Sequence, residues 1–151
     1  MRKRNIVLSL AAAPAVAALL SSCATSQHVA HSSLTVHCTE NRTGGQDPTN
    51  GGVAGRGRCT LTGGLHDSGP VTSYRTLNGT TALIRSVVTG AKGTITFVIK
   101  INLTGGAEPW TVTSGTGAYT KLHGHGLVVV DNYASTPATS VLKGTVSQAK
   151  A

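Results

Sequence analysis

The chain has 151 residues, of which 12% are charged, 3% are aromatic and 19 are glycine, and its formal net charge is +8. This length excludes two ordinary domains. After Arg2, Lys3 and Arg4 the basic residues are scattered along the chain, with few aromatic rings to stack on bases, and this excludes a nucleic-acid-binding surface. Abundant threonine, valine and glycine favour strands and turns over helices, because β-branched side chains suit a pleated sheet and glycine supplies turn geometry.

The N-terminus has the pattern of an export signal. Three basic residues, Arg2, Lys3 and Arg4, precede an apolar, alanine-rich run from Ile6 to Leu20. A basic start followed by about 7–15 apolar residues and then small residues is typical of signal peptides. The run is too short for a permanent transmembrane helix, which needs about 20 apolar residues. We therefore expect residues 1–22 to be a cleaved signal peptide and the protein to be exported.

A cysteine at the end of this leader predicts a lipid anchor. Leu20-Ser-Ser-Cys23 resembles the lipobox of bacterial lipoproteins, in which an aliphatic residue and two small residues precede a cysteine. In that family the cysteine thiol receives a diacylglyceryl group and the cysteine becomes the mature N-terminus. The resemblance implies lipid attachment at Cys23 and a location at the membrane of the cell envelope. The alternative is ordinary cleavage after Ala24, which discards Cys23 and releases a secreted protein.

The segment after the leader predicts a tether and then a folded domain. Residues 23–33 are mostly small and polar and show no periodicity, as is typical of a flexible tether. The domain is expected over residues 34–151.

Two cysteines remain for pairing, Cys38 and Cys59. Both lie in strand-like runs, with a segment rich in Gly, Asn and Thr between them. In an oxidising compartment two such cysteines form a disulfide, whereas a zinc site would need closely spaced CxxC partners. We predict a Cys38–Cys59 disulfide, which contributes about 3 kcal/mol of stability in the chain-entropy model.

Strand-like runs alternate with glycine-rich breaks along the rest of the chain at a spacing of about ten residues. In the clearest run, Thr94–Leu103, every second residue is apolar, which is typical of an antiparallel sheet with one buried face. About eight such strands can stack as a sandwich or close into a barrel, and closure removes exposed edges. We predict a single small antiparallel barrel of about eight strands, with Ile95, Phe97, Ile99, Ile101 and Leu103 on one buried face. The expected strands are Leu34–Cys38, Arg58–Thr62, Val71–Leu77, Ala82–Thr89, Thr94–Leu103, Trp110–Ser114, Gly124–Asp131 and Ala138–Val146.

The run from Trp110 to Gly126 carries a family resemblance. It contains the pattern Gly115-x-Gly117-x-Tyr119-x-x-Leu122-x-Gly124-x-Gly126. This pattern resembles the strand–turn–strand signature of the allene oxide cyclase-like barrel superfamily, which includes the dirigent proteins. The resemblance implies an eight-stranded barrel in which Tyr119 and Leu122 pack inward, Gly124 lets the next strand bend, and the interior holds a small apolar ligand.

Two classes of function are compatible with these features. The first is a non-catalytic envelope protein whose barrel binds a small apolar ligand or a surface partner. The second is a barrel isomerase or cyclase of the allene oxide cyclase-like type. No catalytic residue carries over from the family, because the carboxylates of the mature domain all lie outside the matching run, so binding is favoured; they are Glu40, Asp47, Asp67, Glu108 and Asp131.

Histidines offer a weaker signal. His123 and His125 share one face of an expected strand, a spacing that chelates a metal only if a third ligand such as His37 or His66 converges. We interpret them as surface histidines and expect no metal and no cofactor. His66 and the following aspartate, Asp67, are expected in a polar turn, with a general base as the alternative reading of that pair.

Overall fold

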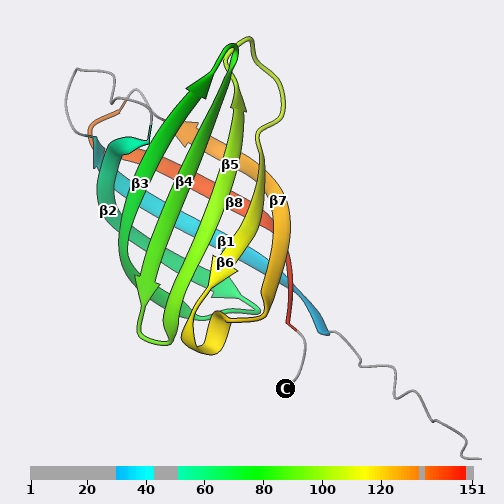
Figure 1. Cartoon of the computed structure of the whole chain (residues 1–151). Helices are drawn as coiled ribbons and strands as arrows, with labels where there is room; N and C mark the ends of the chain where they lie inside the picture. The colour runs from blue at the N-terminus through cyan, green and yellow to red at the C-terminus, as the bar shows by residue number, and fades with distance from the viewer. Residues whose placement is uncertain (1–29, 43–50, 133–134, 149–151) are drawn as a thin grey trace, which may run out of the picture.

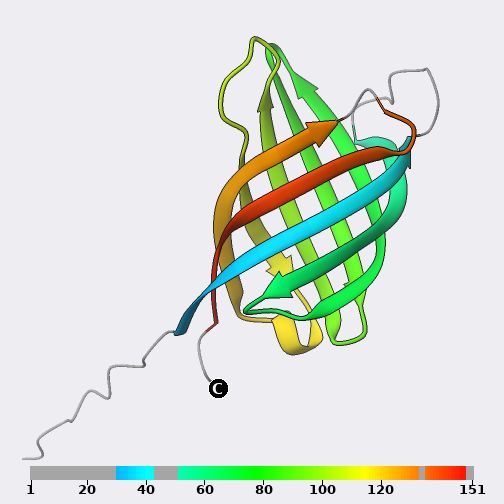
Figure 2. The ribbon, with the colours of Figure 1, turned by 180° about the vertical axis from the view of Figure 1, so that it is seen from behind.

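The computed structural model describes residues 30–42, 51–132 and 135–148. These residues form one closed barrel of eight antiparallel strands, in which each strand pairs with its sequence neighbours and the last strand pairs with the first (Figure 1, Figure 2). The predicted fold class and strand number are thus confirmed. The elements are β1 (Ala30–Arg42), β2 (Gly52–Gly63), β3 (Asp67–Asn78), β4 (Thr81–Gly90), β5 (Gly93–Asn102), β6 (Pro109–Gly115), the short 3₁₀ helix η1 (Gly117–Tyr119), β7 (Leu122–Asn132) and β8 (Ala138–Gln148).

The first two strands are longer than the sequence pattern indicates. β1 begins at Ala30, so residues 30–33, which the pattern assigns to the tether, pair with β8. The rest of the predicted tether, the leader and Cys23 lie outside the described residues. β2 extends back to Gly52 through glycines that resemble a turn in sequence. At Gly57 the β1 backbone is so close that a Cβ atom would lie 1.9 Å from the carbonyl oxygen of Thr39, so glycine here permits close strand approach.

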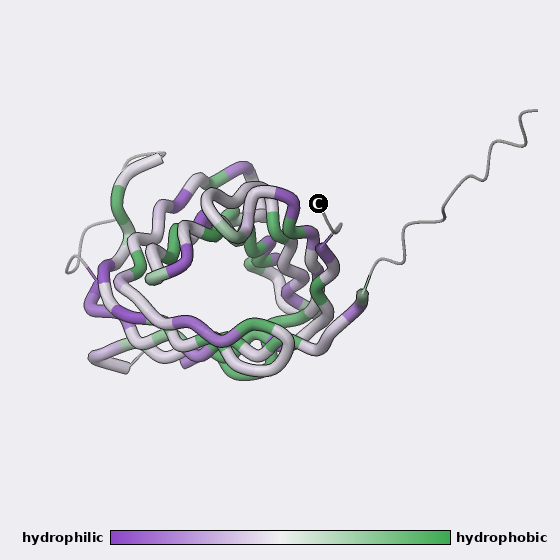
Figure 3. The backbone as a smooth tube through the Cα atoms, turned by 90° about the horizontal axis from the view of Figure 1, so that it is seen from below, coloured by the Kyte–Doolittle hydropathy of each residue, from purple (hydrophilic) through white to green (hydrophobic). Residues whose placement is uncertain are grey.

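Inward-pointing apolar side chains from all eight strands form one core. Viewed from below, the strands make a closed ring (Figure 3). Ile95, Phe97 and Ile99 are buried as predicted, and Ile101 packs against the core. The prediction for Leu103 is wrong, because β5 ends at Asn102 and the Leu103 side chain is 57% exposed beyond it. The buried core residues are Leu34, Val36, Cys38, Cys59, Leu61, Val71, Val88, Ile95, Phe97, Ile99, Trp110, Tyr119, Leu122, Leu142 and Val146.

Trp110 fits this core because its neighbours on β7 and β8 are glycines. Trp110 faces Gly126 across the β6–β7 ladder, and Gly126 faces Gly144 across the β7–β8 ladder. A Cβ atom at Gly144 would lie 2.6 Å from a ring carbon of Trp110. The indole Nε1 donates to the carbonyl oxygen of Lys143 at 3.2 Å, and the ring meets Phe97 edge-on with centroids 5.7 Å apart. The absence of a side chain at Gly144 therefore makes room for the large aromatic ring of Trp110.

The predicted disulfide is present between Cys38 and Cys59. The two residues are directly opposite each other in the β1–β2 ladder, and both side chains are buried in the core. The disulfide therefore joins two strands inside the barrel, in addition to their backbone hydrogen bonds.

Candidate functional site

The two ends of the barrel differ in the segments that they carry. The end drawn at the bottom of Figure 1 carries the β2–β3 and β4–β5 turns, η1, the start of β1 and the end of β8. We call it the terminal end, because Ala30 and Gln148 both lie there. The opposite end carries the β3–β4 turn and the β5–β6 loop.

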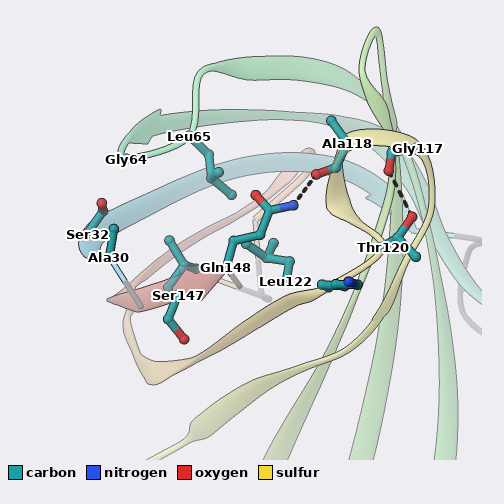
Figure 4. A pocket seen from close by; sticks show the side chains of 12 residues that line it. Ala30, Ser32, Gly64, Leu65, Gly117, Ala118, Thr120, Leu122, Ser147 and Gln148 are labelled. Atoms are coloured by element: carbon teal, nitrogen blue, oxygen red, sulfur yellow. Dashed lines mark hydrogen bonds between the residues drawn. The ribbon is translucent and has the colours of Figure 1, made fainter. Parts of the chain in front are cut away.

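A pocket of about 580 Å³ opens at the terminal end (Figure 4). Such a volume lies within the range of about 300–1,000 Å³ that is typical of small-molecule sites. Leu122 and Val146 are buried and Leu65 is half-buried, so these three side chains give the pocket an apolar inner surface. Lys121 is the only charged side chain among the described lining residues. The lining comprises Ala30, Ser32, Gly64, Leu65, Gly117, Ala118, Thr120, Lys121, Leu122, Val146, Ser147 and Gln148.

Hydrogen bonds fix the wall of the pocket that η1 forms. The side-chain amide of Gln148 donates to the carbonyl oxygen of Ala118, and the Thr120 hydroxyl donates to that of Gly117 (Figure 4). The Ala118 amide donates to the carbonyl oxygen of Lys92 at 2.9 Å. Gly117 has a φ of 58°, a conformation that favours glycine. The wall is thus attached both to β8 and to the β4–β5 turn.

Asp67 and Tyr119 connect three segments of the terminal end. The Tyr119 hydroxyl donates to the Asp67 carboxylate at 2.7 Å, and the same carboxylate accepts backbone amides of Ser68, Ala91 and Lys92 at 2.8, 3.0 and 3.2 Å. The bond from Tyr119 is the main reason that the pKa of Asp67 falls to about 2. Burial, together with the Asp67 carboxylate, raises the pKa of Tyr119.

This arrangement favours a structural role for Asp67 over a general base. A carboxylate that accepts four hydrogen bonds and has a low pKa is a weak proton acceptor near neutral pH. Tyr119 and Leu122 are buried, as the resemblance implied. The contact between Asp67 and Tyr119 was not predicted, because 52 residues separate the two side chains and no local pattern links them.

A second polar feature lies inside the barrel, between β1, β3 and β4. The hydroxyl groups of Ser73 and Ser86 are 2.8 Å apart and both side chains are buried. Glu40 interacts with Ser73 across β2, where Gly55 leaves space: a Cβ atom at Gly55 would lie 2.8 Å from Oε2 of Glu40. Burial raises the pKa of Glu40, while Ser73 and the charge of Arg42 act in the opposite direction.

The histidines considered in the sequence do not converge. His123 and His125 are exposed on β7, His37 is exposed on β1, and His66 is exposed next to the β2–β3 turn. Across the described ranges, no three His, Cys, Asp or Glu side chains lie close enough together to hold a metal ion. The two β7 histidines are surface residues.

No protein-family model, no curated protein and no solved structure matches this chain. Within the part of the chain that the structure describes, there is no helix of the length and apolarity needed to cross a membrane. Among the described residues, the pocket at the terminal end and the inward-facing Glu40 carboxyl group are two features that could bind or react with a small molecule.

Proposed function

We propose that this protein is an exported, lipid-anchored envelope protein that binds a small apolar ligand in the terminal-end pocket. The observation that carries this proposal is the pocket of about 580 Å³ with Leu65, Leu122 and Val146 on its inner surface. Ser32, Thr120 and Gln148 add hydroxyl and amide groups to the lining. An apolar cavity with a few polar groups that orient the ligand is the usual composition of a small-molecule site.

Cysteine usage supports the exported, anchored part of the proposal. The Cys38–Cys59 disulfide is of the kind that persists in an oxidising compartment. The third cysteine, Cys23, is then left over, and lipidation at Leu20-Ser-Ser-Cys23 accounts for it.

The binding proposal is tested with the neutral apolar dye 1-N-phenylnaphthylamine, which fluoresces strongly in apolar surroundings. The chain without its leader and without Cys23 (residues 24–151) is suitable, because all the strand pairing of the barrel lies within residues 30–148. We expect saturable binding. Ala118→Trp, at an exposed lining position, should weaken it about tenfold, equivalent to about 1.4 kcal/mol.

The matched control adds the same indole away from the pocket. Leu83 is 39% exposed on β4 and does not line the pocket, so Leu83→Trp should leave dye binding unchanged. A linear, unsaturable fluorescence response, or an equal loss of binding in both variants, would contradict the proposal.

A second candidate is an isomerase or cyclase that acts inside the barrel. Glu40 favours it, because burial raises the pKa of its carboxyl group, so that at a given pH more of the group carries a proton that it can donate than in an exposed glutamate. Glu40→Gln preserves the side-chain shape and removes the acidic proton. For an enzyme, this change should lower turnover by about 10²–10⁴-fold. Because Glu40 does not line the terminal-end pocket, dye binding there should be unchanged, and screening epoxide and polyene substrates for Glu40-dependent turnover tests this candidate.

A further inference from the structure

The terminal-end pocket lies close in sequence to the proposed lipid anchor. Ala30 lines the pocket and is also the first residue of β1. Cys23 precedes it by only seven residues, and seven residues span at most about 25 Å whatever their conformation. The maximum distance between Cys23 and Ala30 is thus shorter than the hydrocarbon core of a bilayer is thick, about 30 Å. If Cys23 is acylated, the pocket cannot move far from the membrane surface.

The lining of the pocket indicates what kind of molecule it receives there. Leu65, Leu122 and Val146 present aliphatic carbon, and Ala30 and Ala118 add methyl groups. Aliphatic surface of this kind suits an alkyl chain, since its contribution is non-directional and scales with buried apolar area.

The charge at the pocket favours an anionic headgroup. Lys121 is exposed, and no Asp or Glu is found among the described lining residues. Lys92, in the β4–β5 turn to which η1 is attached, adds a second cation at this end. The Asp67 carboxylate at the same end accepts hydrogen bonds from four donors, Tyr119 among them, and does not line the pocket.

We propose that the pocket holds one acyl chain of an anionic phospholipid, taken from the membrane in which the Cys23 anchor lies. This inference rests on the proposed function, because it names the ligand of the same pocket. Lys121 attracts the phosphate-bearing headgroup at the bilayer surface, and the aliphatic lining accepts the chain. Basic side chains close to a membrane surface attract anionic lipids in this way.

The experiment uses the mature, membrane-extracted protein in vesicles of phosphatidylcholine and phosphatidylglycerol. A trace of phosphatidylglycerol carries a photoactivatable diazirine at the end of one acyl chain. After irradiation, peptide mass spectrometry locates the adducts. We expect them on the segments that contain Leu65, Leu122 and Val146. Ala118→Trp should reduce these adducts severalfold, whereas Leu83→Trp should not.

The headgroup is tested by charge reversal at the pocket and away from it. Lys121→Glu should reduce labelling by the phosphatidylglycerol probe at least about fivefold, because the loss of one lysine near a membrane alone has that effect. It should not reduce labelling by the same probe built on phosphatidylcholine. Lys100, exposed on β5 and outside the lining, gives the control Lys100→Glu, which should change neither. Both substitutions are at exposed positions, so the fold is expected to be retained.

Several results would overturn the inference. Adducts only on outer-wall segments, or equal labelling in the wild type and Ala118→Trp, would show that the pocket takes no membrane lipid. If the acyl group on Cys23 itself fills the pocket, the phosphatidylglycerol probe will not label the pocket, and the inference is likewise overturned. Equal effects of Lys121→Glu on both probes would overturn the anionic headgroup. If the neutral dye binds and the lipid does not, only this inference fails; if neither binds, the proposed function fails as well.

Discussion

Asp67 stabilises the terminal end of the barrel by accepting hydrogen bonds from three chain segments. Its pKa is lowered from 3.8 to about 2, chiefly by the Tyr119 hydroxyl. A carboxyl group whose folded-state pKa is lowered stabilises the protein above its unfolded pKa and loses that contribution as the pH falls through the folded pKa. The contribution of Asp67 should therefore be complete above about pH 5 and should decline as the pH falls toward 2.

Tyr119→Phe tests this contribution at one residue. The variant loses the main cause of the low pKa, so the pKa of Asp67 should rise toward its ordinary value. We expect the free energy of unfolding at pH 7 to fall by about 1 kcal/mol, a value reduced for partial solvent screening. Urea unfolding measured from pH 2 to pH 7 should show that the difference in unfolding free energy between the variant and the wild type becomes smaller as the pH falls.

Tyr74→Phe is the matched control. Tyr74 packs against the guanidinium group of Arg85, 4.3 Å from its ring centroid, and is not bonded to Asp67. This control should be nearly neutral at every pH. A Tyr119→Phe defect that is the same at pH 2 and pH 7 would show that the hydroxyl acts independently of the Asp67 charge.

At the scale of single strands, two glycines of β2 serve different purposes, and alanine substitution separates them. A Cβ atom at Gly57 would lie 1.9 Å from the backbone carbonyl oxygen of Thr39. One at Gly55 would be too close only to Oε2 of Glu40, 2.8 Å away, and its nearest backbone contact, the oxygen of Asn41, would be at 3.6 Å. Backbone cannot move without disturbing the β1–β2 ladder, but a carboxylate can rotate. Gly57→Ala should lower the free energy of unfolding by about 1–3 kcal/mol, the range for overpacking. Gly55→Ala serves as the control and should lower the free energy of unfolding much less. Urea unfolding measures both values. If the two substitutions lowered the free energy of unfolding equally, the close approach of β1 and β2 at Gly57 would not limit the side chain there.

Gly124 tests the packing of β7 against its neighbours. A Cβ atom there would lie 2.7 Å from a methyl carbon of Val146 and 3.2 Å from one of Val112. Gly124→Val should therefore destabilise the barrel by about 1–3 kcal/mol, with a clear fall in melting temperature. His125→Val introduces the same side chain at an exposed position of the same strand and should have little effect. A melting temperature of Gly124→Val equal to that of the wild type would contradict the expected crowding.

At the scale of the whole molecule, the barrel could be predicted from the sequence because its signals are local. Alternation along Ile95, Phe97 and Ile99 specifies a buried strand face, and glycine-rich breaks separate the strands. The Cys38–Cys59 disulfide could be predicted from the number of cysteines together with the expectation that the protein is exported. Strand ends were harder, because the glycines of β2 resemble a turn in sequence but lie in a ladder.

The candidate site could not be predicted in the same way. Its pocket is assembled from the start of β1, the β2–β3 turn, η1 and the neighbouring ends of β7 and β8. Glu40 becomes a half-buried acid only because Gly55 and Ser73 come next to it through strand pairing. Such neighbours depend on barrel closure, and no spacing in the sequence encodes them.

The proposed location of the whole molecule at the membrane depends on lipidation of Cys23, and this prediction is independent of the barrel. Leu20-Ser-Ser-Cys23 predicts that the protein extracted from membranes begins at Cys23 and carries a diacylglyceryl group. A single acyl chain gives only marginal membrane binding, whereas two or more give stable anchoring, so the lipidated protein should remain in the membrane fraction after high-salt washing. Cys23→Ala should be released or left unprocessed, as shown by intact mass and fractionation. Ser22→Ala keeps a small residue before the cysteine and should still be lipidated, which controls for disturbance of the leader. Recovery of the wild type as a soluble, unlipidated chain beginning at Thr25 would exclude the anchor and, with it, the supply of membrane lipid to the pocket.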